Sequence, residues 1–246
     1  YQASLPGYQA EGVPVKQAES LLKKTVRLAC RARDSFWQRN AENPDRRLRP
    51  LVAASIGPYG AYLADGSEYR GNYGVTTAAL RDFHAPRWHA LAETGADLFA
   101  CETIPSFQEA EVLLSLMRES PYMPAWVSFS CKDGQHLSDG TPIAECAALF
   151  AECEQLVAVG VNCTAPRFVA SLIEKVRAGS PQKRIVVYPN SGEHYDARKR
   201  VWRGTADALD FARAAMQWRT LGASLIGGCC RTGPAHIRAM REALCA

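Results

Sequence analysis

The sequence lacks the features that would place the protein in a membrane or mark it for secretion. Among its 246 residues, no apolar run approaches the ~18 residues that a membrane-spanning helix requires. The N-terminal residues do not show the succession of charged, apolar and small residues that is typical of a signal peptide. We therefore expect a cytoplasmic protein that has no membrane partner.

The sequence also has little excess charge. Its formal net charge is +4, and the basic residues are scattered along the chain. The densest basic cluster, residues 45–49, lies between Pro44 and Pro50. A solvated loop explains such a cluster better than a nucleic-acid site does. We expect no nucleic-acid partner.

The nine cysteines do not have the pattern of a disulfide scaffold. Their number is odd, the chain is too long for a small disulfide-stapled domain, and Cys229 and Cys230 are adjacent. This pattern favours a reducing compartment, where thiols are kept for metal binding or for chemistry.

Short apolar runs rich in Val, Ile, Ala and Leu alternate with segments of helical periodicity. The runs are nearly continuous, which is typical of strands buried on both faces of a parallel sheet. The predicted strands are residues 51–57, 97–103, 125–131, 156–163, 184–190 and 224–230. The predicted helices are residues 15–40, 76–94, 106–119, 142–153, 166–178 and 205–221. This alternation predicts an α/β fold.

Chemically useful side chains lie at the C-terminal ends of several predicted strands, including the last one. In a (β/α)8 TIM barrel that end carries the active site, so we favour a barrel over an open sheet. Six strands are found where a closed barrel needs eight, and Tyr1 begins a loop of the kind that leaves a strand. We therefore expect one barrel domain over residues 1–246 that lacks its first strand and most of its second. The gap should lie between residues 51–57 and 224–230.

The strongest local motif is Gly227-Gly228-Cys229-Cys230. Adjacent cysteines rarely bond to each other, but two thiolates at a strand end can hold one soft cation. Cys163 ends another predicted strand and supplies a third thiol. Three thiolates leave one tetrahedral position open on Zn²⁺, as in catalytic zinc sites. The alternative, which stays open for Cys163 taken alone, is that these cysteines are small buried hydrophobic residues.

The motifs Gly160-Val161-Asn162-Cys163 and Gly227-Gly228-Cys229-Cys230 resemble the two zinc motifs of the homocysteine S-methyltransferase family. Cys101-Glu102-Thr103 and residues 188–193 resemble two further strand ends of that family. Residues 55–69 resemble the branch that uses S-methylmethionine. The likeness covers essentially the whole chain in the family's order.

The resemblance implies that Cys163, Cys229 and Cys230 bind Zn²⁺ and that the sulfur of homocysteine takes the open position. The thiolate would attack the methyl group of a cationic sulfonium donor, S-methylmethionine, and give methionine. The expected partners are therefore these two small molecules, and we expect a monomer. The donors S-adenosylmethionine and betaine stay open.

Three residues are candidates for substrate binding. The resemblance implies that Glu102 accepts hydrogen bonds from the ammonium group of homocysteine; the alternative is a structural carboxylate. Asn162 is expected to orient substrate or the groups around the metal, unless it only forms the turn at a strand end. Tyr1, like Tyr69 and Tyr188, is a candidate for cation–π contact with a sulfonium, the alternative being packing.

Two other functions compete with this interpretation. One is a structural zinc protein or an inactive, truncated paralogue. The other is a phosphate-binding TIM-barrel enzyme that uses Gly227-Gly228, although the cysteines that follow offer a phosphate nothing useful.

Overall fold

The computed structural model describes residues 1–40, 42, 48–196, 201–204 and 207–245, and its fold is α/β, as the sequence predicts. The strands are β1 (Ala53–Ile56), β2 (Leu98–Ile104), β3 (Ala125–Phe129), β4 (Leu156–Asn162), β5 (Arg184–Tyr188), β6 (His194–Asp196), β7 (Val201–Arg203) and β8 (Ala223–Ile226). The helices are α1 (Leu5–Ala10), α2 (Val15–Arg39), α3 (Tyr59–Leu63), the 3-10 helix η1 (Ser67–Tyr69), α4 (Thr77–Ala92), α5 (Phe107–Glu119), α6 (Ile143–Leu149), α7 (Pro166–Gly179), α8 (Ala208–Thr220) and α9 (Pro234–Cys245). Most of the basic cluster, residues 45–47, lies outside the described residues.

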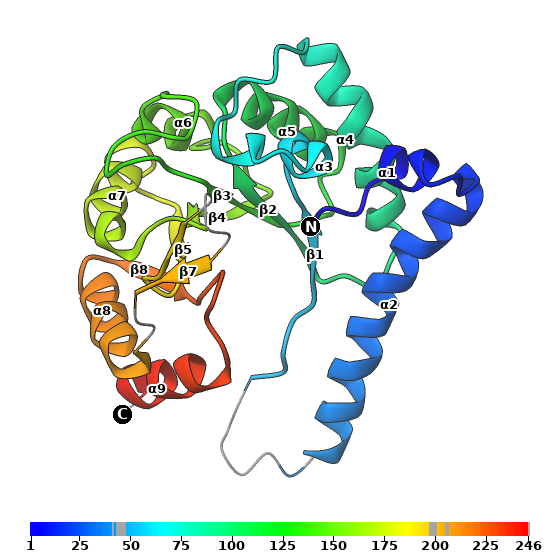
Figure 1. The fold of residues 1–246 in the computed structure, drawn as a ribbon. Helices are drawn as coiled ribbons and strands as arrows, with labels where there is room; N and C mark the ends of the chain where they lie inside the picture. Colours follow the sequence, from blue (N-terminus) through cyan, green and yellow to red (C-terminus); the bar gives the residue numbers. More distant parts are fainter. Residues whose placement is uncertain (41, 43–47, 197–200, 205–206, 246) are drawn as a thin grey trace.

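Six strands form one parallel sheet in the order β1-β2-β3-β4-β5-β8. Figure 1 shows these strands along an arc with the helices around them, which is the arrangement of a (β/α) barrel. The two edges of the sheet are β1 and β8, and in the described part of the chain they do not pair with each other. This confirms the prediction that residues 51–57 and 224–230 are the edge strands.

The central strands are apolar because both of their faces are covered. In β4, Ala158, Val159 and Val161 are all almost completely buried, whichever face of the sheet they lie on. Gly160 approaches the backbone of Val186 so closely that any side chain there would collide with it. This close contact fixes the register of β4 against β5, and with it the position of the last residues of β4.

Several predicted boundaries are wrong. The strands predicted at 125–131 and 184–190 each end two residues earlier, at Phe129 and Tyr188, and two other elements end four residues earlier. The strand predicted at residues 224–230 ends at Ile226, the last residue of β8 that pairs with β5. The two adjacent cysteines therefore lie in the loop after β8 rather than on it. The helix predicted at 142–153 ends at Leu149, and a turn completes the segment. Of the helix predicted at 205–221, residues 205 and 206 lie outside the described part.

Several short elements were not predicted: α1, α3, η1, the β6–β7 hairpin and the C-terminal α9. Most of them are too short for a periodic apolar pattern to show. Among the described residues, no helix is long and apolar enough to cross a membrane.

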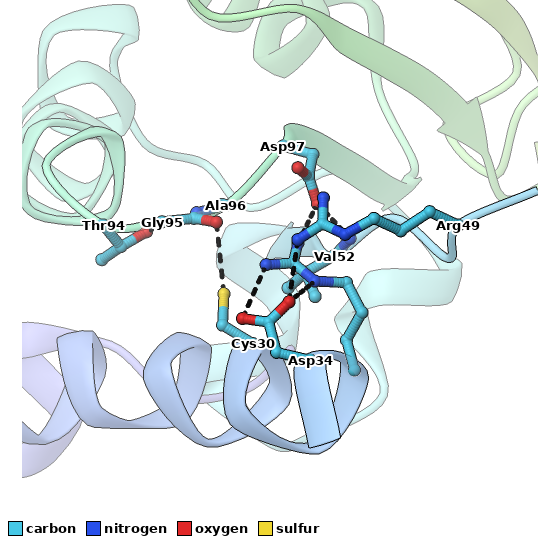
Figure 2. A network of polar contacts seen from close by, with 9 residues as sticks. Cys30, Asp34, Arg49, Val52, Thr94, Gly95, Ala96 and Asp97 are labelled. Carbon is cyan, nitrogen blue, oxygen red and sulfur yellow. Dashed lines mark hydrogen bonds and ion pairs between the residues drawn. The ribbon is translucent and has the colours of Figure 1, made fainter. Parts of the chain in front are cut away.

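A polar network fixes helix α2 to the beginnings of β1 and β2 (Figure 2). Arg33 Nη1 donates to Asp97 Oδ2 at 2.5 Å, and the same oxygen accepts from Val52 N at 2.6 Å. Arg49 Nη2 donates to Asp34 Oδ1 at 2.8 Å. Because Val52 and Asp97 directly precede their strands, one carboxylate aligns the N-terminal ends of two neighbouring strands.

A second, buried network joins α4 and α5. Nε2 of His84 lies 2.7 Å from Glu109 Oε1, and its Nδ1 lies 3.1 Å from Arg87 Nη2. Burial lowers the pKa of His84 more than Glu109 raises it, so the ring is neutral and carries its proton on Nε2. Burial also lowers the pKa of Arg87 to about 10, which leaves the guanidinium charged at neutral pH. A neutral imidazole thus links a buried cation to a buried carboxylate.

The same network holds the loop that follows β1. Glu109 accepts from Tyr59 N at 2.6 Å and from the Tyr73 hydroxyl at 3.0 Å. Arg87 Nη2 donates to Gly57 O at 2.6 Å. The segment from residue 57 to residue 73 is therefore attached to α4 and α5 at both of its ends.

Replacing Glu109 by Ala should lower the free energy of unfolding by about 3–5 kcal/mol, because it leaves Arg87 without its buried countercharge. Glu111→Ala, an exposed site on the same helix, should change it by less than about 0.5 kcal/mol. Urea unfolding followed by circular dichroism measures both values. Equal destabilisation by the two substitutions would contradict the role of the network.

Candidate metal centre

Three cysteine thiols meet beyond the C-terminal ends of β4 and β8. Cys163 follows β4 directly, whereas Cys229 and Cys230 lie in the loop after β8. The Sγ of Cys163 is 2.6 Å from that of Cys229 and 3.7 Å from that of Cys230, and all three sulfurs lie within 4.8 Å of one another. Within the described ranges, no other group of three His, Cys, Asp or Glu side chains converges in this way. The structure thus brings together the three cysteines that the sequence singles out.

The backbone explains how residues far apart in the sequence meet here. Strands β4 and β5 pair with Asn162 opposite Tyr188, and Cys163 N donates to Tyr188 O at 3.3 Å. The segment after β5 then bonds to the loop that carries the two adjacent cysteines. Cys229 N donates to Pro189 O at 2.8 Å, and Ser191 N donates to Cys230 O at 3.0 Å. The exit of β5 therefore connects both halves of the thiol cluster.

Cys163 has an unusual backbone conformation, with a φ angle of 48°. A left-handed conformation is strained for a residue that has a side chain, and such strain is found most often at functional sites. Thr103, at the end of β2, has a φ angle of 62°. The chain is thus turned sharply at the ends of β2 and β4, the two strands on either side of β3.

The three thiols differ in acidity because they share hydrogen bonds. The thiols of Cys163 and Cys229 donate to the sulfur of Cys230 and lower the pKa of Cys230 to about 3. Hydrogen bonds with Cys229 and Cys230, followed by burial, raise the pKa of Cys163 well above its ordinary value. At neutral pH the cluster therefore holds one thiolate, and ionisation of the other two thiols requires a positive charge among them.

This donor set fits a soft divalent cation. A tetrahedral site with metal–sulfur bonds of about 2.3 Å has sulfur–sulfur edges of about 3.8 Å, and the Cys163–Cys230 separation of 3.7 Å matches this length. Cys163 and Cys229 are closer, at 2.6 Å, so they must separate when an ion enters. Thiolates favour zinc over magnesium or calcium, and three of them leave a fourth position open.

Asn162 lies within the protein beside the cluster and is 1% exposed. Its Oδ1 accepts from Thr103 N at 2.7 Å and from Ser128 Oγ at 2.8 Å. Its Nδ2 donates to Thr103 Oγ1 at 2.7 Å and reaches Cys229 Sγ at 3.9 Å. The predicted substrate residue Asn162 is thus a brace that joins β2, β3 and the thiol cluster.

Glu102 lies on β2 and is half-buried, and its side chain bonds to residues of β1 and β5. Its Oε1 accepts from Ser55 Oγ at 2.5 Å, and its Oε2 accepts from the Tyr188 hydroxyl at 3.1 Å. The Tyr188 hydroxyl also lies 2.5 Å from Ser128 Oγ, which in turn bonds to Asn162. Glu102 and Asn162 therefore belong to one polar network that leads to the cluster.

Two tyrosines border the thiols. Burial raises the pKa of the Tyr1 phenol, and the nearby Cys163 raises it further. A hydrogen bond with Thr103 has the opposite effect and lowers this pKa. Tyr69 as a whole residue is 47% exposed. Burial of its hydroxyl, and then interaction with Cys163, raise the pKa of Tyr69. Tyr188, the third candidate for contact with a cation, lies instead in the polar network with Glu102.

The sequence did not single out Ser55 and Ser128, which hold Glu102 and Asn162 in place. A signal was available, because each is a hydroxyl residue inside an otherwise apolar predicted strand. A buried hydroxyl needs a hydrogen-bond partner, so such a residue indicates a polar neighbour on the next strand.

A family model described as homocysteine S-methyltransferase matches residues 1–244 of the chain. Homocysteine S-methyltransferase YbgG of Bacillus subtilis is 50% identical over 97% of this chain and 75% of its own length. The homocysteine S-methyltransferase of Escherichia coli is 47% identical over 98% of this chain and 76% of its own length. Selenocysteine Se-methyltransferase of Brassica oleracea is 45% identical over 99% of this chain and 73% of its own length.

Solved structures of one relative have the same fold. The crystal structure of the metallated homocysteine methyltransferase MmuM from Escherichia coli matches with a TM-score of 0.85 and 42% identity. The oxidised form of that enzyme matches with a TM-score of 0.86 and 44% identity. Both matches cover 98% of this chain and 76% of the relative.

In the reduced, metal-free protein, we expect iodoacetamide to alkylate Cys230 at a rate that changes less than about twofold between pH 5 and pH 8. The lowered pKa keeps this sulfur ionised over the whole range, and the thiolate is the reactive form. Cys163, whose pKa is raised, should react slowly throughout. Mass spectrometry of the alkylated peptides measures both rates. A Cys230 rate that climbs about tenfold per pH unit would show an ordinary thiol instead.

Proposed function

The chain belongs to the homocysteine S-methyltransferase family, and from this premise we propose that it moves a methyl group from a sulfonium donor, S-methylmethionine, to the sulfur of L-homocysteine. The products would be two molecules of methionine. The observation that carries the proposal is the convergence of Cys163, Cys229 and Cys230 at the C-terminal ends of the strands.

We propose zinc as the metal that these cysteines hold. Three soft sulfur ligands suit zinc better than cations that prefer oxygen. Structural zinc sites have four protein ligands, whereas catalytic sites keep one position for water or substrate. Only three candidate ligands converge among the described residues, which favours a catalytic over a structural site. When bound there, zinc would keep the homocysteine sulfur as a thiolate, the nucleophilic form of a thiol.

The side chains around the cluster would position the two substrates. Asn162 would fix Cys229 and the end of β2 through its four polar contacts. Glu102 would accept hydrogen bonds from the ammonium group of homocysteine, with its orientation set by Ser55 and Tyr188. Such positioning contributes most of the acceleration in a transfer between two bound molecules, which react from about 3–3.5 Å apart.

The negative charge of the site favours a cationic donor. The thiolates and Glu102 are anionic, and Tyr1 offers an aromatic ring at the border of the cluster. A sulfonium is drawn to such surroundings by charge and by cation–π attraction. The thioether that remains after methyl transfer is neutral, so this attraction is lost and the product can leave.

The phosphate-binding alternative is disfavoured by the loop after β8. Phosphate sites of barrels use free backbone N–H groups of such loops. Here Gly227 N donates to Val187 O at 2.9 Å, and Cys229 N donates to Pro189 O at 2.8 Å. These two N–H groups are therefore already engaged within the protein.

The direct test is methionine formation from homocysteine by the zinc-loaded protein, with S-methylmethionine, S-adenosylmethionine and betaine compared as donors. We expect S-methylmethionine to give the highest kcat/KM. Cys163→Ala should lower the rate more than about 100-fold, since changes to residues that merely support a ligand already cost 10–100-fold. It should also lower the zinc content, measured by mass spectrometry of the metal.

The matched control is Cys245→Ala, which removes an exposed cysteine outside the cluster and should leave rate and zinc content at the wild-type values. Turnover by Cys163→Ala at the wild-type rate would overturn the role of the cluster. No methionine from any donor with the zinc-loaded wild type would overturn the proposed activity.

A further inference from the structure

Glu68 carries a buried carboxylate oxygen that the protein itself does not satisfy. Its Oε2 is inaccessible to solvent and has no hydrogen-bond partner among the described residues. A buried carboxylate oxygen without a partner is costly, so such atoms are normally paired with a donor or a cation. The carboxylate is therefore prepared for a positively charged group that comes from outside the chain.

The position of Glu68 is fixed by its backbone. It lies in η1, whose first residue donates from its N–H to Asp65 Oδ1 at 2.9 Å. Its carbonyl oxygen accepts from Ser130 Oγ at 2.9 Å, and its N–H packs so closely on Gly60 that no side chain fits there. The loop that contains it is also attached to the buried network of Glu109 at both ends. The carboxylate thus stays in place although the loop lies outside the sheet.

Glu68 lies near Tyr1, one of the two tyrosines that interact with the thiol cluster. Its negative charge adds to the effect of burial in raising the pKa of the Tyr1 phenol, which also interacts with Cys163 and Cys229. The next residue, Tyr69, contacts Cys163 through its hydroxyl. Tyr1 is therefore close enough to interact with the Glu68 carboxylate as well as with the thiols.

Two arginines that directly follow residues of the site, Arg70 after Tyr69 and Arg231 after Cys230, are already paired with carboxylates. Arg70 Nη2 lies 3.2 Å from Asp65 Oδ2, and Arg231 Nε lies 2.9 Å from Glu193 Oε2. Neither therefore supplies the countercharge that Glu68 lacks.

We propose that Glu68 supplies the countercharge for the cationic methyl donor and that the Tyr69 ring lines the same subsite. This inference rests on the proposed function and assigns its two substrates to different carboxylates. Glu102, on β2, takes the homocysteine side. Glu68, in η1, takes the donor side.

The reaction itself explains why a carboxylate is useful there. The homocysteine thiolate forms a bond to the methyl carbon while the bond between that carbon and the donor sulfur breaks. The donor sulfur keeps the electron pair and changes from a cationic sulfonium to a neutral thioether. Glu68 therefore attracts the donor more strongly than the demethylated product, which favours exchange of product for fresh donor.

The test compares Glu68→Gln with Glu102→Gln in the zinc-loaded protein. Loss of a close ion pair with a sulfonium, or of a hydrogen bond between charged groups, costs roughly 10- to 100-fold in affinity. Glu68→Gln should raise the KM for S-methylmethionine by that factor and change the KM for homocysteine less than about twofold. Glu102→Gln should show the reverse pattern. Glu174→Gln, an exposed carboxylate on α7, is the matched control and should leave both values unchanged.

Two further measurements keep the proposal open to refutation. Calorimetric titration with S-methylmethionine alone should show the same loss of affinity in Glu68→Gln, and it decides the role of Glu68 even if the wild type makes no methionine. The second measurement concerns Tyr69, which is half exposed, so its variants should fold. Tyr69→Leu removes the aromatic ring, whereas Tyr69→Phe keeps it. Tyr69→Leu should therefore raise the donor KM roughly 3- to 10-fold more than Tyr69→Phe does. A donor KM and a donor affinity within twofold of wild type in Glu68→Gln would overturn the proposal, and so would an equal rise in both KM values.

Discussion

The site depends on one constraint: three thiols that the chain must hold together although they cannot all ionise without a cation. Parallel strands make the convergence possible, because the C-terminal ends of neighbouring strands β4, β5 and β8 meet at one edge. The exit of β5 bonds to both Cys163 and Cys229 through its carbonyl groups. The cluster is therefore a property of the sheet register and not only of the cysteine loop.

The surroundings of the cluster continue the same electrostatic pattern. The buried cation Arg87 is bonded within a network that includes His84 and Glu109. Its charge is therefore not available to balance the carboxylates near the thiols. The carboxylates of Glu102 and Glu68 face the site without a cationic side chain bonded to either of them among the described residues. A site built in this way favours positively charged partners, which suits the metal ion, the ammonium group and the sulfonium that we propose for it.

The sequence predicted the fold and the three thiols well, for physical reasons. Buried parallel strands such as β4 leave a continuous apolar run, and two adjacent cysteines after two glycines have few structural uses. The sequence could not show that Asn162 would be enclosed by Thr103 and Ser128, because those contacts depend on the register of three strands. It also placed Cys229 and Cys230 on a strand that ends earlier, at Ile226. Residues 55–69, which resemble the S-methylmethionine-using branch, include Glu68. The sequence did not single out this residue, because an unpaired carboxylate is visible only once its neighbours are known.

We propose that the chain supplies three sulfur ligands to the metal and leaves one position for the substrate. X-ray absorption at the zinc edge tests this most directly, because it counts the sulfur neighbours of the metal. The zinc-loaded protein should show three sulfur atoms at about 2.3 Å, and a fourth should appear when homocysteine is added. Four protein ligands that stay unchanged on adding homocysteine would contradict the account.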